Sequence, residues 1–129
     1  MRLILDAGGV SALAGHRGRL AEWFKRDDLS GARIPAIVLT EVLTGDHRRD
    51  HATNHLLRFC EIHDVDEALA REGARLRTLT GRAGTISVTD AIVVALAARQ
   101  QGAVIVTSDP KDMTALAEQA HRSIRVSDV

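Results

Sequence analysis

Apolar residues occur in short runs and in helical stripes along this 129-residue chain. The runs Leu3–Leu5 and Val104–Val106 are apolar at every position, which is typical of strands covered on both faces. Weaker strand patterns occur at residues 33–34, 62–65 and 124–126. The pattern between the strands predicts helices at residues 11–14, 20–25, 37–44, 46–59, 66–80, 87–101 and 110–120.

Turn-forming residues separate these elements. Gly8 and Gly9 follow the first strand as a breaker pair, and Asp27 and Asp28 close the helix at 20–25. The helix at 87–101 contains a stretch that is apolar on all sides, so it should be buried. Strands that alternate with helices indicate one domain, residues 1–129, of the α/β class with a mainly parallel sheet of about five strands.

Two of the predicted strands are followed closely by a carboxylate, Asp6 after the first and Asp109 after the strand at 104–106. The carboxyl ends of parallel strands form the edge of a sheet where ligands bind. If Glu41 and Asp90 join them, each pair of acids ~6 Å apart repels by about 3 kcal/mol. A fold tolerates this only if a cation relieves the repulsion or the pKa values rise. Carboxylate ligands select Mg²⁺ or Mn²⁺ over zinc.

Three of these acids also have a purely structural explanation. Asp109 stands before a proline, a common N-cap and first-turn pair. Asp90 follows Ser87 by three residues, as in a capping box. Glu41 lies in a mostly apolar helix, where a narrow solvated stripe would accommodate it. Asp6 has no predicted helix to cap.

The composition limits how a nucleic acid would be held. Seventeen basic residues balance seventeen acidic ones, so any acidic cluster that meets RNA needs a basic rim. Only three aromatic residues are present, which argues against base stacking and favours contacts with the backbone. Cys60 is the single cysteine, and no apolar run approaches the ~20 residues that span a bilayer. We therefore expect a cytoplasmic protein without membrane contact.

Four short motifs occur in an order that resembles PIN domains. They are Leu-Asp-Ala at 5–7, Thr-Glu-Val at 40–42, Val-Thr-Asp-Ala at 88–91 and Val-Thr-Ser-Asp-Pro at 106–110. The chain is similar in size to the toxins of bacterial VapBC toxin–antitoxin pairs, and the resemblance covers essentially its whole length. It implies a three-layer α/β/α fold, an Mg²⁺- or Mn²⁺-dependent endoribonuclease, a homodimer and inhibition by a cognate antitoxin of the VapB type.

The same resemblance implies roles for individual residues. The catalytic residues would be Asp6, Glu41, Asp90 and Asp109, and these four would bind the metal together with Asp112 as an auxiliary acid. Thr107 and Ser108 would supply supporting hydroxyls. Ala7 stands where many relatives carry Thr or Ser, which leaves Ser11 to supply that hydroxyl.

Other functions are also compatible with parts of the sequence. A catalytically silent module on the same scaffold, binding a protein or RNA partner, is the main alternative. A phosphoacceptor receiver domain fits less well, because it expects an acidic pair after the first strand. His47, His51 and His55 recur at helical spacing, although a solvated or partner-facing surface explains them better than zinc. The arginines of that segment, Arg48, Arg49 and Arg58, would contact RNA phosphates or the antitoxin.

Overall fold

The computed structural model describes residues 1–26, 31–120 and 122–129. Its five strands form one sheet in the order β3-β2-β1-β4-β5, and each neighbouring pair is parallel. The strands are β1 (Arg2–Leu5), β2 (Ala32–Pro35), β3 (Cys60–His63), β4 (Ala103–Thr107) and β5 (Ile124–Asp128). The predicted α/β class and the parallel sheet of five strands are confirmed.

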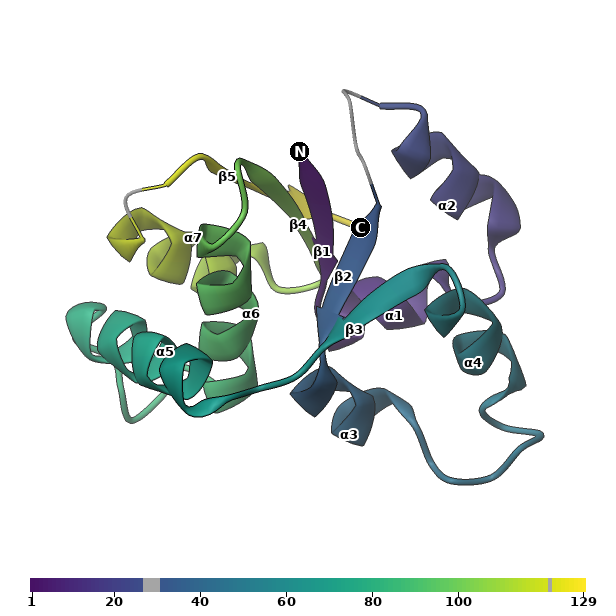
Figure 1. The fold of residues 1–129 in the computed structure, drawn as a ribbon, viewed down its shortest axis with the longest axis horizontal. Helices are drawn as coiled ribbons and strands as arrows, with labels where there is room; N and C mark the ends of the chain where they lie inside the picture. Colours follow the sequence, from purple (N-terminus) through teal and green to yellow (C-terminus); the bar gives the residue numbers. More distant parts are fainter. Residues whose placement is uncertain (27–30, 121) are drawn as a thin grey trace.

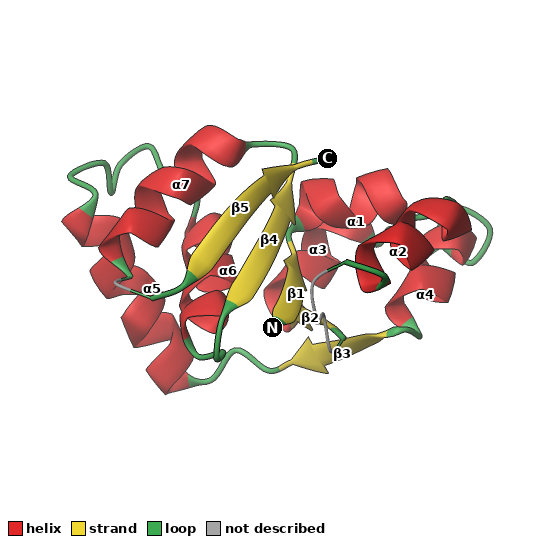
Figure 2. Cartoon of the chain, turned by 90° about the horizontal axis from the view of Figure 1, so that it is seen from above, coloured by secondary structure: helices red, strands yellow, loops and turns green. Residues whose placement is uncertain are grey.

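Helices cover both faces of this sheet (Figure 1). The helices are α1 (Ala7–Leu13), α2 (Arg17–Phe24), α3 (Leu39–Val42), α4 (His51–Leu57), α5 (Glu67–Leu79), α6 (Val88–Ala98) and α7 (Pro110–Gln119), with a 3₁₀ turn at Ala36–Val38. Seen from above, the sheet forms the middle layer, with α5, α6 and α7 on one side and α1, α2 and α4 on the other (Figure 2). This is the expected three-layer arrangement. None of the described helices is long and apolar enough to cross a bilayer.

Burial in the core explains why the sequences of two strands and one helix are continuously apolar. β1 is the central strand of the sheet and β4 lies next to it, and the apolar side chains of both are fully buried. Helix α6 packs against β1, β2 and β4, and its residues 91–97 are buried on all sides. Helix α5 packs on α6 at Gly73, where a Cβ atom would lie 2.9 Å from Ile92 Cδ1. The outer helix can approach closely because this position carries no side chain.

The predicted start of the first helix is wrong. Helix α1 begins at Ala7, directly after Asp6, and runs through both glycines. A Cβ atom on Gly9 would lie 2.3 Å from the carbonyl oxygen of Val106, and one on Gly8 would lie 2.0 Å from Ser108 Oγ. The close approach of α1 to the end of β4 therefore requires glycine, despite its poor helix propensity.

The segment predicted as a helix at 46–59 is helical only from His51 to Leu57. Before it, the buried carboxylate of Asp50 accepts hydrogen bonds from Thr44 N (2.9 Å), Thr44 Oγ1 (2.8 Å) and Gly45 N (2.8 Å). These bonds hold residues 44–50 in a turn, so His47 lies outside α4. The predicted helix at 37–44 is likewise shorter and starts as a 3₁₀ turn. Asp27 and Asp28, predicted to close α2, lie outside the described residues.

Candidate metal centre

Five acidic residues come from four parts of the chain that meet at the carboxyl ends of the central strands. Asp6 follows β1, Glu41 lies on α3, and Asp90 lies in the first turn of α6. Asp109 takes the N-cap position of α7, and Asp112 lies in the first turn of that helix. The sequence-based explanation of Asp109 as a helix cap is only half right, because within the described residues its side chain makes no hydrogen bond to the α7 backbone. Its carboxylate is therefore directed elsewhere.

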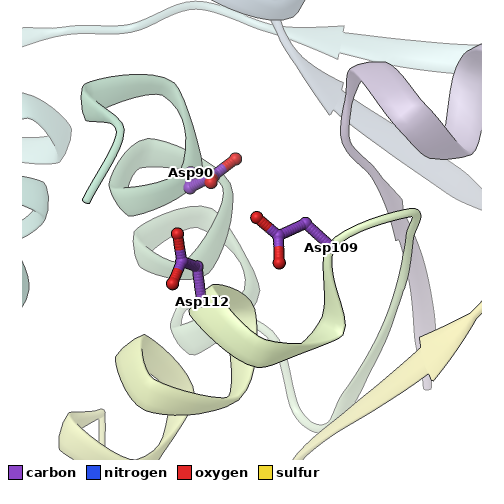
Figure 3. Close-up of side chains that lie close together, drawn as sticks. All are labelled: Asp90, Asp109 and Asp112. Carbon is purple, nitrogen blue, oxygen red and sulfur yellow. The ribbon is translucent and has the colours of Figure 1, made fainter. Parts of the chain in front are cut away.

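Asp90, Asp109 and Asp112 form the tightest group, which we name the aspartate triad. Each offers a carboxylate oxygen, and these oxygens all lie within 4.8 Å of one another. The three side chains point toward a common space between the start of α6 and the start of α7 (Figure 3). Asp109 is exposed, whereas Asp90 and Asp112 are half-buried. A set of carboxylate oxygens at this spacing has the chemistry that Mg²⁺ and Mn²⁺ require of their ligands.

Asp6 lies close enough for its charge to act on Asp90, and it is only 5% exposed. Its Oδ1 accepts a hydrogen bond from Gly9 N at 2.7 Å, and its Oδ2 accepts one from Thr107 Oγ1. Burial raises the pKa of Asp6, and the charges of Glu41 and Asp109 raise it further, against the two hydrogen bonds, which lower it. Because its side chain accepts the hydrogen bond from Gly9 N, Asp6 is the N-cap of α1, whereas the sequence analysis predicted no helix for it to cap.

Asp90 has the largest shift among the acids of this cluster. Burial and, to a smaller extent, the charges of the other four acids together raise its pKa to about 6. Its backbone N–H donates to Ser87 Oγ at 3.2 Å, so the expected Ser87 cap is present. A cation in the cluster would relieve the repulsion that burdens Asp90.

The structure places the other predicted site residues less centrally. Glu41 is exposed, and its charge acts on Asp6 and Asp90 from outside the triad. Ser108 is exposed at the end of β4, with its Oγ against Gly8. Ser11 is exposed on α1, and the hydroxyl that bonds to Asp6 is that of Thr107. Asp112, expected as an auxiliary acid among the metal ligands, lies in the triad.

Arg82 is a site residue that sequence reasoning missed. Its Nη2 donates to Asp112 Oδ1 at 2.7 Å, which places one positive charge beside the aspartate triad. The sequence shows Arg82 only as part of the loop 81–85, and no local pattern links it to a residue thirty positions later. Only the packing of this loop against α7 brings the two side chains together.

The histidine pattern does not form a metal site in the described part of the chain. The aspartate triad is the one group of three or more potential ligands there whose atoms lie close enough to share an ion. His51 and His55 instead line a groove between α2 and α4. A solvated or partner-facing role for these histidines stays a prediction.

Comparison with solved structures supports the same fold. The chain is similar to DNA-bound VapBC from Salmonella typhimurium, with 20% identity and a TM-score of 0.74 over 99% of this chain and 98% of that one. It is also similar to VapBC-1 from nontypeable Haemophilus influenzae, with 17% identity and a TM-score of 0.70 over 99% and 98%. A third similar structure is VapBC2 from Rickettsia felis bound to a promoter DNA fragment, with 16% identity and a TM-score of 0.67 over 100% of this chain and 99% of that one. At these identities the similarity establishes the fold.

Comparison of sequences establishes the family. No curated protein matches the chain. The family model described as "PIN domain" matches residues 4–119, which span all five aspartate and glutamate residues of the site. PIN domains are generally nucleases, that is, hydrolases that act on nucleic acid, and they typically depend on a divalent metal. The match confirms what the four short motifs suggested: the chain belongs to the PIN-domain family.

Proposed function

We propose that this protein is a divalent-metal-dependent endoribonuclease and the toxin of a VapBC-type toxin–antitoxin system. The observation that carries the proposal is the meeting of the aspartate triad with Asp6 at the carboxyl ends of β1 and β4. Membership of the PIN family supports hydrolysis of nucleic acid. RNA as the substrate and Mg²⁺ or Mn²⁺ as the ion belong to the proposal.

The residues that would hold the ion are Asp90, Asp109 and Asp112, with Asp6 and Glu41 beside them. Bound there, Mg²⁺ or Mn²⁺ would polarise a phosphodiester and activate water. Hydrogen bonds from Gly9 N and Thr107 Oγ1 hold the carboxylate of Asp6 in one orientation, so Asp6 would present a fixed ligand position to the ion. A bound cation would hold Asp90 in its charged form, because it offsets the neighbouring negative charges that, together with burial, raise the pKa of Asp90 to about 6.

The loop that connects α3 to α4, residues 43–50, carries exposed arginines. Asp46 Oδ1 accepts hydrogen bonds from Arg48 N (2.9 Å) and Arg49 N (3.1 Å), and Asp50 anchors the end of the same loop. The side chains of Arg48 and Arg49 are exposed, and the loop follows the helix that carries Glu41. Arginine pairs well with phosphate, so this loop supports backbone contacts with RNA near the acidic cluster.

The proposal is tested by cleavage of RNA with purified protein in Mg²⁺, in Mn²⁺ and in EDTA. We expect cleavage with either ion and none in EDTA. Asp109→Asn and Asp90→Asn should each reduce the rate by more than about 100-fold, beyond the 10–100-fold typical of residues that only support ligands. Asp64→Asn, at an exposed aspartate outside the cluster, is the control and should retain the rate. Full activity of Asp109→Asn would overturn the metal assignment, and an inactive wild type that binds no Mn²⁺ would favour the silent module.

The proposed antitoxin partner has a candidate docking surface on the opposite side of the sheet from α5, α6 and α7. A groove of about 720 Å³ lies between α1, α2 and α4, with Leu20, Phe24 and Phe59 among its apolar lining. Its polar lining residues are His16, Arg17, His51 and His55, and none of its lining residues is acidic. The groove therefore suits an apolar segment with acidic flanks, which we assign to the antitoxin. Phe59 is 59% exposed, so Phe59→Ala should weaken the complex without unfolding the toxin.

We also propose a homodimer and a cytoplasmic site of action. Leu79 and Val88, at the two ends of the loop that joins α5 to α6, are 48% and 53% exposed. They offer apolar surface to a second copy of the chain. Light scattering of the purified protein measures the mass directly, and a monomer at micromolar concentration would remove the dimer from the proposal.

A further inference from the structure

Asp50 is a buried acid that the proposed metal centre does not use. Within residues 1–26, 31–120 and 122–129, the buried charged side chains are those of Asp6 and Asp50, at 5% and 4% exposure. Asp6 belongs to the acidic cluster, whereas Asp50 stands directly before α4. A charge is costly to bury unless hydrogen bonds compensate it. The hydrogen bonds of Asp50 therefore indicate what its burial achieves.

Asp50 closes the loop that joins α3 to α4, which we name the 43–50 loop. Its Oδ1 accepts hydrogen bonds from Thr44 N (2.9 Å) and Thr44 Oγ1 (2.8 Å), and its Oδ2 accepts one from Gly45 N (2.8 Å). Aspartate at an N-cap usually bonds to its own helix, but among the described residues Asp50 makes no such bond to α4. The carboxylate instead ties the end of the loop to its beginning. These bonds, first the one from Thr44 N, lower the pKa of Asp50 and keep it ionised at neutral pH.

The other acid of the loop also turns its carboxylate toward the backbone. Asp46 Oδ1 accepts hydrogen bonds from Arg48 N (2.9 Å) and Arg49 N (3.1 Å). The side chains of Arg48 and Arg49 are exposed, and no carboxylate in the described part of the chain forms an ion pair with either. The loop therefore directs its two acids inward and offers two guanidinium groups to a ligand.

The 43–50 loop begins beside the metal centre. Helix α3 follows the carboxyl end of β2, and the charge of Glu41 on this helix acts on Asp6 and Asp90. Helix α1, which starts after Asp6, packs against both α3 and α4, the two helices that the loop joins. Figure 1 shows the loop at the same end of the sheet as the start of α6. A nucleic acid bound at the acids would therefore lie close to this loop.

We propose that Asp50 is a positioning residue for RNA, which holds the 43–50 loop so that Arg48 and Arg49 contact backbone phosphates beside the metal centre. The inference rests on the proposed nuclease function and adds a residue that touches neither the ion nor the RNA. Guanidinium groups match phosphate in a two-pronged geometry. A loop that is already ordered binds more tightly than one that must be ordered on binding, because ordering costs conformational entropy. Loss of the Asp50 bonds should therefore weaken RNA binding and leave the metal ligands in place.

RNA binding is measured in EDTA, so that the result does not depend on cleavage. The probe is a fluorescently labelled single-stranded RNA of about 20 nucleotides, followed by anisotropy at several salt concentrations. A variant with Arg48→Gln and Arg49→Gln should lose about 1.4 of the salt slope, at about 0.7 per phosphate contact, and bind about tenfold more weakly. Its matched control carries Arg19→Gln and Arg71→Gln, at exposed positions on α2 and α5, and should bind like the wild type.

Asp50→Asn tests the positioning role, because its two possible effects have opposite signs. Removal of a negative charge by itself favours RNA, whereas loss of the bonds to Thr44 and Gly45 frees the loop. We expect affinity about tenfold weaker than in the wild type, and no further loss when Asp50→Asn is added to the Arg48/Arg49 variant. Asp64→Asn removes the same charge at an exposed position outside the loop and should not weaken binding.

A second pair of variants does not alter the buried acid. Thr44 is exposed, and Thr44→Val removes the hydroxyl that donates to Asp50, whereas Thr44→Ser keeps it. The valine variant should bind RNA more weakly, and the serine variant should bind like the wild type. In cleavage assays with Mg²⁺, Asp50→Asn and Thr44→Val should raise KM and keep kcat, since they remove binding rather than chemistry. Mn²⁺ affinity should stay at the wild-type value in both.

Two results would overturn the inference. One is an unchanged salt slope in the Arg48/Arg49 variant, which would mean that the loop does not contact RNA. The other is an equal loss of affinity from Asp50→Asn with and without the two arginines, which would mean that Asp50 serves stability alone. Either result in a protein that cleaves RNA would leave the nuclease assignment intact. A wild type that binds RNA through the loop and cleaves none would retain the inference and reject the nuclease.

Discussion

The hydroxyl of Thr107 donates a hydrogen bond to the carboxylate of Asp6, which lies 101 residues earlier in the chain. The same hydroxyl oxygen accepts a hydrogen bond from the backbone N–H of Asp109 at 2.9 Å. One buried side chain thus fixes the acid at the end of β1 relative to the acid after β4. The spacing of the proposed metal ligands depends on the register of these two strands.

We predict that Thr107→Val weakens metal binding and slows cleavage by 10–100-fold, the usual effect of removing a group that orients a ligand. Valine keeps the volume but removes a hydrogen bond that lowers the pKa of Asp6 and leaves the Asp109 N–H without its partner. This also costs about 1–3 kcal/mol of stability. Thr107→Ser keeps the hydroxyl and should restore most of the rate. Equal activity of the valine and serine variants would show that the hydroxyl has no such role.

The stability of the metal-free protein should depend on Asp90 and pH. Its pKa is about 6 when folded and 3.8 as the ordinary value, so the folded state binds its proton more tightly. The folded protein is therefore favoured at low pH and loses that advantage as pH rises through 6. Relative to wild type, Asp90→Asn should be nearly neutral at pH 4 and more stable at pH 7, by up to about 3 kcal/mol. Urea unfolding in EDTA measures this difference, and a difference that does not vary with pH would contradict it.

Two glycines in helices should respond oppositely to alanine. At Gly9 the new Cβ atom would lie 2.3 Å from the backbone oxygen of Val106, which cannot move without shifting β4. We expect a loss of about 3 kcal/mol and weaker metal binding, because Gly9 N also holds Asp6. Gly18 on α2 has open space at its Cβ position, so Gly18→Ala should be neutral or stabilising by up to about 1 kcal/mol. Chemical denaturation compares the two, and similar effects at both sites would refute the packing argument.

Arg82→Gln should separate charge balance from metal ligation. The substitution removes the cation 2.7 Å from Asp112 and leaves the cluster more negative. The metal-free protein should become less stable, while Mn²⁺ should bind at least as tightly as in the wild type. Asp112→Asn should instead weaken Mn²⁺ binding. If Arg82→Gln loses Mn²⁺ affinity to the same extent as Asp112→Asn, then Arg82 organises the site rather than merely balancing its charge.

The sequence predicted the sheet well because its strongest signals are local. The apolar runs of β1 and β4 and the all-round apolar α6 are buried as their patterns require. The start of α1 was missed because two glycines indicate a break by propensity. Their real cause is the approach of α1 to Val106, nearly one hundred residues away, which no local pattern encodes.

The sequence predicts which residues belong to the candidate site, but it does not predict which of them lie closest together. Strand ends and motif order point to Asp6, Glu41, Asp90 and Asp109, yet the tight group in the structure contains Asp112 and leaves Glu41 at the margin. Asp112 was expected as an additional metal ligand, and the sequence carries a local signal for it, since Asp109 and Asp112 are three residues apart at the start of one helix. No local sequence signal points to Arg82, because its contact with Asp112 arises from tertiary packing alone.

Calorimetric titration of Mn²⁺ into metal-free protein tests most directly whether the separate acids form one cation site. The comparison uses the wild type, Asp6→Asn, Asp90→Asn, Asp109→Asn and the control Asp64→Asn at pH 7.5. We predict that the wild type and the Asp64 variant bind alike, and that each of the other three binds at least about tenfold more weakly. Wild-type affinity in Asp90→Asn and Asp109→Asn would contradict the account.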